Sequence, residues 1–153
     1  MGSTGEQEPE REDDEHLQTF LQEIRILVPG AQIIGGFLFS VPFQTRFETL
    51  TRGQRHVFAI VFVATMLAIV LFLAPAAYHR IVWPIRQKRR FVAYGTRFLL
   101  AGFASLALSI VLSAYLIASI VLGDLAATII ASCFAVLVSL SWWILPLRRA
   151  HES

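Results

Sequence analysis

Side chains that could carry out acid–base, nucleophilic or metal chemistry are few in this 153-residue sequence, and they stand apart from one another. His56 and His79 flank one long apolar run, so a helix between them would hold them roughly 34 Å apart, too far to share a metal ion. The acids beyond the first sixteen residues each stand alone beside an apolar run: Glu23, Glu48, Asp124 and Glu152. The sequence has no paired carboxylates, no nucleophile beside a base, no Cys/His cluster and no glycine-rich phosphate loop. We therefore predict no catalytic residue, no metal ligand and no cofactor, and a protein that is not an enzyme.

The densest basic segment is RIVWPIRQKRR, residues 80–90. Its basic side chains suit anionic lipid headgroups at a cytoplasmic membrane face, each contributing about 1 kcal/mol: Arg86, Lys88, Arg89 and Arg90. The same charges would also orient the chain across a membrane, and the two roles are compatible. We expect orientation of the chain with incidental lipid contact.

Tyr78, His79 and Arg80 stand at the start of this segment. Together with Glu23 and Arg25 they could form a partner or headgroup site. The alternative is that Tyr78 and Arg80 simply anchor a helix end at the membrane boundary, where such side chains are common.

A second set of polar positions could line a pathway. Gln32, Gly35 and Gly36 lie in a run that also contains Pro29 and Pro42, and interrupted membrane helices can leave backbone groups free to bind ions or substrates. The alternative is that the glycines allow close helix packing and the prolines mark helix ends. Serines could extend the pathway, or could hydrogen-bond to carbonyls of their own helices: Ser105, Ser109, Ser113, Ser119, Ser132 and Ser139.

The elements that would position these residues are membrane helices. The chain is 56% hydrophobic and only 16% charged, with a mean hydropathy of +0.62. Three uncharged runs exceed the roughly 20 residues that a helix needs to cross a bilayer: 57–78, 98–122 and 125–145. The basic residues stand beside these runs without the pattern of a nucleic-acid groove, so the pI of about 9.1 does not indicate nucleic-acid binding.

The shorter run 26–43 decides the topology. If it crosses, the side holding both termini carries ten Lys and Arg residues and the other side carries three. If it instead returns to its own side, the distribution is five against eight. Because basic residues concentrate on the cytoplasmic side, we predict an all-α integral membrane four-helix bundle with both termini in the cytoplasm.

The two ends of the chain differ from the spans. Residues 1–16 hold seven of the eleven acids and are predicted to form a disordered tail. From residue 17 an amphipathic helix leads into the first span, either lying in the headgroup region or forming the polar end of a long first helix broken at Pro29. The membrane domain then covers 17–149, and 150–153 form a C-terminal tail.

The last two spans are predicted to form a tight hairpin. Gly123 can take a conformation that ends one helix, and Asp124 can cap the next. Small residues recur every four positions on both helices, and we expect these rows to face each other: Ala101, Ser105, Ser109 and Ser113 on one, and Ala127, Ala131, Ala135 and Ser139 on the other.

Three stretches carry a family resemblance: LQEIRILVPGAQ, FLFSVPFQTRF and FLAPAAYHR. Through them the chain resembles, over residues 17–149, a family of small bacterial four-helix integral membrane proteins catalogued as domain of unknown function 6328. The most specific element is 74–80, supported by 41–43. The resemblance implies four spans in the cytoplasmic membrane, and it implies no activity.

From these patterns we expect a non-catalytic membrane protein, an accessory or scaffold subunit that binds other membrane helices or a second copy of itself. The bilayer and its anionic headgroups are its other expected partners. The alternative is a small oligomeric channel or transporter with a pathway along the first span and the serine row of the third.

Overall fold

The computed structural model describes residues 4–81, 88–145 and 148, with the backbone alone at 4–17, 79 and 88–90. The elements follow in the order α1 (Thr4–Ser40), η1 (Val41–Phe43), η2 (Thr45–Thr49), α2 (Arg52–Ile81), α3 (Lys88–Val121), α4 (Asp124–Ser139) and the π-helical turn η3 (Leu140–Ile144). The described residues contain no strand. The all-α prediction is confirmed.

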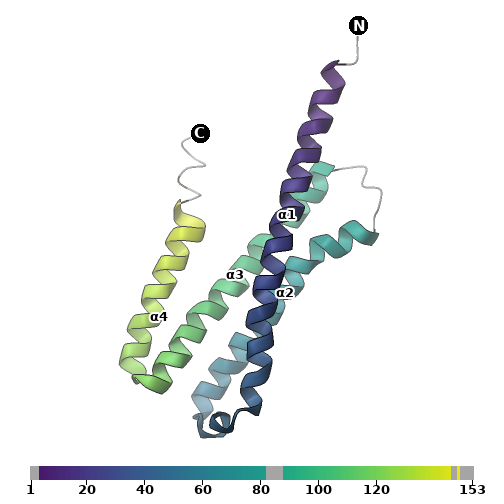
Figure 1. The fold of residues 1–153 in the computed structure, drawn as a ribbon. Helices are drawn as coiled ribbons and strands as arrows, with labels where there is room; N and C mark the ends of the chain where they lie inside the picture. Colours follow the sequence, from purple (N-terminus) through teal and green to yellow (C-terminus); the bar gives the residue numbers. More distant parts are fainter. Residues whose placement is uncertain (1–3, 82–87, 146–147, 149–153) are drawn as a thin grey trace.

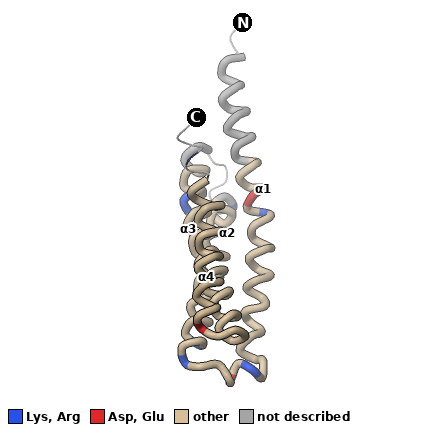
Figure 2. The backbone as a smooth tube through the Cα atoms, turned by 90° about the vertical axis from the view of Figure 1, so that its left-hand side faces the viewer, with Lys and Arg blue, Asp and Glu red and all other residues tan. Residues whose placement is uncertain are grey.

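Among the described residues, four helical segments are long and apolar enough to cross a membrane: Gln18–Phe43, Arg52–Tyr78, Phe91–Val121 and Asp124–Ile144. Figure 2 shows the charged residues of these helices gathered towards their ends, with long uncharged stretches between. The prediction of four spans is confirmed, and the chain is a multi-pass membrane protein. Helices satisfy the span requirement because each backbone group finds its hydrogen-bond partner within the same segment.

Helix α1 is longer and more continuous than the sequence indicated. It runs without interruption through Pro29 and ends at Ser40, immediately before Val41 and Pro42. A proline disfavours the helical conformation of the residue before it, which explains the end at Pro42. The predicted break at Pro29 is wrong, because a membrane helix tolerates a missing amide donor. The lead-in segment is therefore the polar end of one long first helix.

The helix also reaches further towards the N-terminus than expected. Where the sequence predicted a disordered tail over 1–16, the structure continues α1 back to Thr4. Glutamate is a good helix former, and acidic residues near a helix N-terminus interact favourably with its dipole. Residues 1–3 and the predicted tail 150–153 lie outside the described residues.

The four helices do not form a closed ring. Helices α1, α2 and α3 all pack on one another, whereas α4 packs against α3 and, among the described residues, reaches neither α1 nor α2. Figure 1 shows α4 standing to one side of the other three, with the start of α1 and the end of α4 at the same end of the molecule. The predicted bundle is therefore a three-helix core with a fourth helix attached at its flank.

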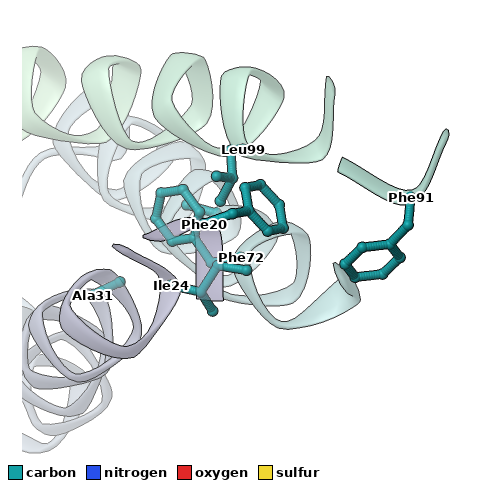
Figure 3. Close-up of a cluster of buried hydrophobic side chains, with 7 residues drawn as sticks. Phe20, Ile24, Ala31, Phe72, Phe91 and Leu99 are labelled. Atoms are coloured by element: carbon teal, nitrogen blue, oxygen red, sulfur yellow. The ribbon is translucent and has the colours of Figure 1, made fainter. Parts of the chain in front are cut away.

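Aromatic rings fill the core between α1, α2 and α3. Figure 3 shows Phe20 and Ile24 of α1, Phe72 of α2 and Leu99 of α3 turned towards a common interior. Phe72 is completely buried. Glycines on α3 make room for these rings, since a Cβ atom added to Gly102 would lie 2.5 Å from Cε1 of Phe72. Helices in lipid gain van der Waals contact in this way, because small residues let their neighbours approach closely.

The turn between α3 and α4 is as short as predicted. Gly123 has a φ of +88°, a conformation that L side chains rarely adopt, so its prediction as the helix-ending glycine is confirmed. Asp124 is the first residue of α4 and does not cap it; Gly123 occupies the cap position. The Asp124 carboxylate lies in the first turn of α4, where it interacts favourably with the positive end of the helix dipole.

Replacing Gly102 by alanine should lower the free energy of unfolding by roughly 1–3 kcal/mol, because the added methyl group meets a fully buried ring that has no room to move. Gly36→Ala is the matched control, since no atom beyond its two chain neighbours and the adjacent backbone of its own helix lies within 4 Å of the position that its Cβ would take. Unfolding in mixed detergent micelles gives the comparison. Equal stability of the two variants would contradict the packing described for α2 and α3.

Candidate functional site

The predicted headgroup or partner site has an aromatic framework. The Tyr78 ring lies 5.7 Å from that of Phe91 and also 5.7 Å from that of Tyr94, between centroids, so the end of α2 is joined to the start of α3. Arg80 is exposed beyond this cluster. The aromatic rings thus have a packing role, and Tyr78 and Tyr94 at 41% and 48% exposed also face the surroundings, as Arg80 does.

For the remaining basic residues of this site, the structure describes the backbone alone or nothing. Arg86 lies outside the described residues, and the side chains of His79, Lys88, Arg89 and Arg90 do as well. The backbone puts Lys88, Arg89 and Arg90 in the first turn of α3. Headgroup binding by this segment stays a prediction.

The predicted pathway residues of α1 do not converge. Gly35 is buried against α2, where an added Cβ would lie 2.9 Å from both Met66 Cε and Ile69 Cδ1. Gln32 and Gly36 are exposed on the outer side of the helix. Gly35 is therefore a packing position, and Gln32 and Gly36 face the surroundings of this chain.

One polar contact lies deep between two spans. Thr65 of α2 and Ser109 of α3 are 0% and 1% exposed, and their hydroxyl oxygens are 2.5 Å apart. Thr65 donates to the Val61 carbonyl at 2.9 Å. The Ser109 hydroxyl also lies 3.5 Å from the Val61 carbonyl, so either hydroxyl can donate to the other while its partner donates to Val61. This pair joins α2 and α3 within the hydrocarbon region. No sequence pattern predicts this role for Thr65, which is an isolated hydroxyl in an aliphatic run.

The same contact corrects the predicted pairing of small-residue rows. Ser109 faces α2, and Ala101 is exposed, so the α3 row does not face α4 as a unit. A spacing of four residues advances about 40° beyond a full helical turn, so a row of four drifts by about 120°. On α4 the row does turn inwards at Ala127, which is completely buried, but Ser139 at its other end is exposed.

The other serines mostly bond within their own helices. Ser105 donates to the Ala101 carbonyl at 3.0 Å, Ser119 to Leu116 at 2.8 Å and Ser132 to Thr128 at 2.8 Å. The reading in which these hydroxyls bond back to the preceding turn is confirmed for all three.

A cavity of about 450 Å³ opens at the end of the molecule opposite the two chain termini. We call it the loop cavity. It lies between the end of α1, the η1–η2 loop, the start of α2 and the last turns of α3, and its lining includes Leu38, Arg46, Phe47, Val61, Ser113 and Ile120. Its walls are almost entirely apolar. The sequence analysis did not find it, because its lining comes from four separate elements.

A larger and more open groove, of about 590 Å³, runs along the flank of the molecule. We call it the side groove. Its floor is the α3 face that includes Ala114 and Ala118, and its walls are Ile34 of α1 and Ile130 and Phe134 of α4. It exists because α4, within the part of the chain that the structure describes, packs against α3 and not against α1, which leaves space between α4 and α1.

Neither hollow offers groups for acid–base or metal chemistry. No group of three or more His, Cys, Asp or Glu residues that could hold a metal ion occurs in the part of the chain that the structure describes. What both hollows offer is apolar surface with few hydroxyl groups. That surface suits hydrocarbon or another helix.

The model of the family of unknown function DUF6328 matches residues 5–146. The chain belongs to this family. The match begins at residue 5, so it includes part of the acidic segment that the resemblance noted in the sequence leaves out. No curated protein matches the chain, and no solved structure does either.

The Thr65–Ser109 contact should be measurable as a coupling energy. In a double-mutant cycle of Thr65→Val and Ser109→Ala we expect about 0.6 kcal/mol, with an upper limit of about 1.7 kcal/mol, as for hydrogen bonds between other membrane helices. The control cycle pairs Ser109→Ala with Thr96→Val, whose hydroxyl bonds only to Val92 of its own helix. A coupling energy no larger than that of the control would contradict the contact.

Proposed function

We propose that this member of the DUF6328 family is a non-catalytic accessory or scaffold subunit that binds a transmembrane helix of another membrane protein in the side groove. The observation that carries the proposal is the combination of a small-residue floor with bulky walls. Ala114 and Ala118 are four residues apart on α3, the spacing at which small residues let a second helix approach closely.

The walls of the side groove support the same proposal. Ile34 on one side and Phe134 on the other are 38% and 41% exposed, so both keep surface available for contact. A helix lying on this floor would contact the partly buried Ala114 and pack between the two walls, giving α4 a second neighbour, whereas Ala118 is 6% exposed and already covered by the protein. Lipid tails are as apolar as these side chains, so specificity for a helix would come from shape.

We also propose that the protein lies in a bacterial cytoplasmic membrane with both termini in the cytoplasm. The support is the excess of basic residues on the side of the termini, ten against three. The even number of candidate spans is consistent with both termini on one side.

The alternative of an oligomeric channel or transporter has less support. Gln32 and Gly36 lie on the outer side of α1, and Ser109 is engaged by Thr65. A pathway that uses Gln32 would therefore have to form between copies of the chain.

Filling the side groove should abolish partner binding. Ala114→Trp places an indole on the groove floor, and Ile129→Trp is the matched control, because Ile129 is 58% exposed on α4 and does not line the groove. We expect a stoichiometric membrane protein to co-purify in mild detergent with the wild type and with Ile129→Trp, and to be lost with Ala114→Trp.

Two results would contradict the proposal. One is a partner that binds both tryptophan variants equally, which would place its site elsewhere. The other is a homo-oligomer without partners that conducts ions in liposomes, which would support the channel.

A further inference from the structure

The loop cavity differs from the side groove in one respect: a cation stands at its rim. Arg46 contributes to the lining, together with the polar side chains of Gln44, Thr49 and Ser113. The other lining residues, which come from α1, the loop, α2 and α3, are apolar or aromatic. A volume of about 450 Å³ lies within the range of ordinary ligand sites.

Arg55, the neighbouring arginine, is engaged by the loop, whereas the Arg46 guanidinium is not. Arg55 donates from Nη2 to the Glu48 carbonyl at 2.6 Å and from Nε to the Leu50 carbonyl at 3.2 Å, and it lies 6.0 Å from the centre of the Phe47 ring. Arg55 therefore holds the loop in place. The Arg46 guanidinium makes no hydrogen bond or ion pair with any residue that the structure describes, so it is available to a ligand.

The loop around the cavity is built to keep its shape. The Thr51 and Gln54 side chains and amides exchange hydrogen bonds at 3.0 and 3.2 Å, which forms a capping box at the start of α2. Gln54 Nε2 also donates to Ser119 Oγ at 3.3 Å and so ties α2 to α3. The Phe47 and Phe58 rings pack edge to face, 5.2 Å apart. A preformed cavity costs little ordering when a ligand binds.

The geometry points to a binding site for an anionic phospholipid, with one acyl chain in the loop cavity and the phosphate at Arg46. The α3 lining from Ile120 to Ser113 runs about 10 Å along the helix axis, from the loop towards the membrane centre. Hydrocarbon fits the apolar walls along this length. Arginine matches phosphate oxygens through paired hydrogen bonds, and it sits where the headgroup would be.

A transmembrane helix is a poorer fit for this cavity. The η1–η2 loop stands at one end of it, whereas the side groove is open along α3 and α4. The lipid proposal does not depend on the proposed helix partner, because Arg46, the loop and Ile120 take no part in the side groove, although Ser113 and Ile117 of α3 line both hollows.

The test is native mass spectrometry of the full-length, delipidated protein in detergent, titrated with phosphatidylglycerol or phosphatidylcholine. The wild type should bind phosphatidylglycerol more tightly. Arg46→Gln should weaken that binding about fivefold and leave phosphatidylcholine binding unchanged, since one basic residue contributes about that factor to anionic lipid binding. Arg52→Gln, which removes a nearby exposed arginine that does not line the cavity, should change neither affinity.

The acyl-chain half of the site is tested separately. Ile120→Trp should fill the cavity and weaken both lipids, with Ile120→Phe as a milder variant, whereas Ile129→Trp on α4 should not. Equal binding of the two lipids by the wild type would overturn the proposal. So would equal effects of Arg46→Gln and Arg52→Gln, full binding after Ile120→Trp in a folded protein, or displacement of the lipid by inorganic phosphate alone.

Discussion

A hydrocarbon layer offers no water to backbone amides and carbonyls, and this constraint shapes the whole molecule. It explains why Pro29 does not interrupt α1, since ending a helix inside the membrane would expose several polar groups to lipid. It also explains why the departures from regular helix occur at the ends of spans. The η1–η2 loop follows the first span, and the Gly123 turn joins the third and fourth.

Within that constraint, the contact between glycines and aromatic rings determines which helices meet. The Phe20 ring packs on Gly95 and the Phe72 ring on Gly102, so α1 and α2 both dock on α3. Helix α4 has no comparable contact with α1 or α2 in the described residues; its ring contact is from Trp142 in η3 to Phe103 of α3, at 5.4 Å. The side groove is the direct result of this unequal packing. The loop cavity has a different origin, because it depends on the hydrogen bonds that hold the η1–η2 loop.

The sequence was informative where one residue or one run decides the outcome. Long uncharged runs gave the four spans, and Gly123 gave the turn, because only glycine readily adopts its φ. It was less informative about which helix faces meet. Ser109 belongs to a small-residue row, yet it bonds to Thr65, because a row at four-residue spacing rotates around its helix and so does not keep facing one neighbour.

The acidic segment was predicted to be disordered from its composition, but the same glutamates extend a helix that the first span has already nucleated. Neither hollow could be predicted, since each is lined by residues from three or more elements.

The central claim is that all four apolar helices cross the bilayer, with the η1–η2 loop and the Gly123 turn on one side. Cys133 is the sole native cysteine, so a Cys133→Ser background allows single cysteines to be placed at Thr45, at Asp124 and at Gln18 near the start of the first span. A membrane-impermeant maleimide should label Thr45→Cys and Asp124→Cys from the same side of sealed vesicles, and Gln18→Cys from the opposite side. Labelling of Thr45→Cys and Asp124→Cys from different sides, or of all three from one side, would contradict the account.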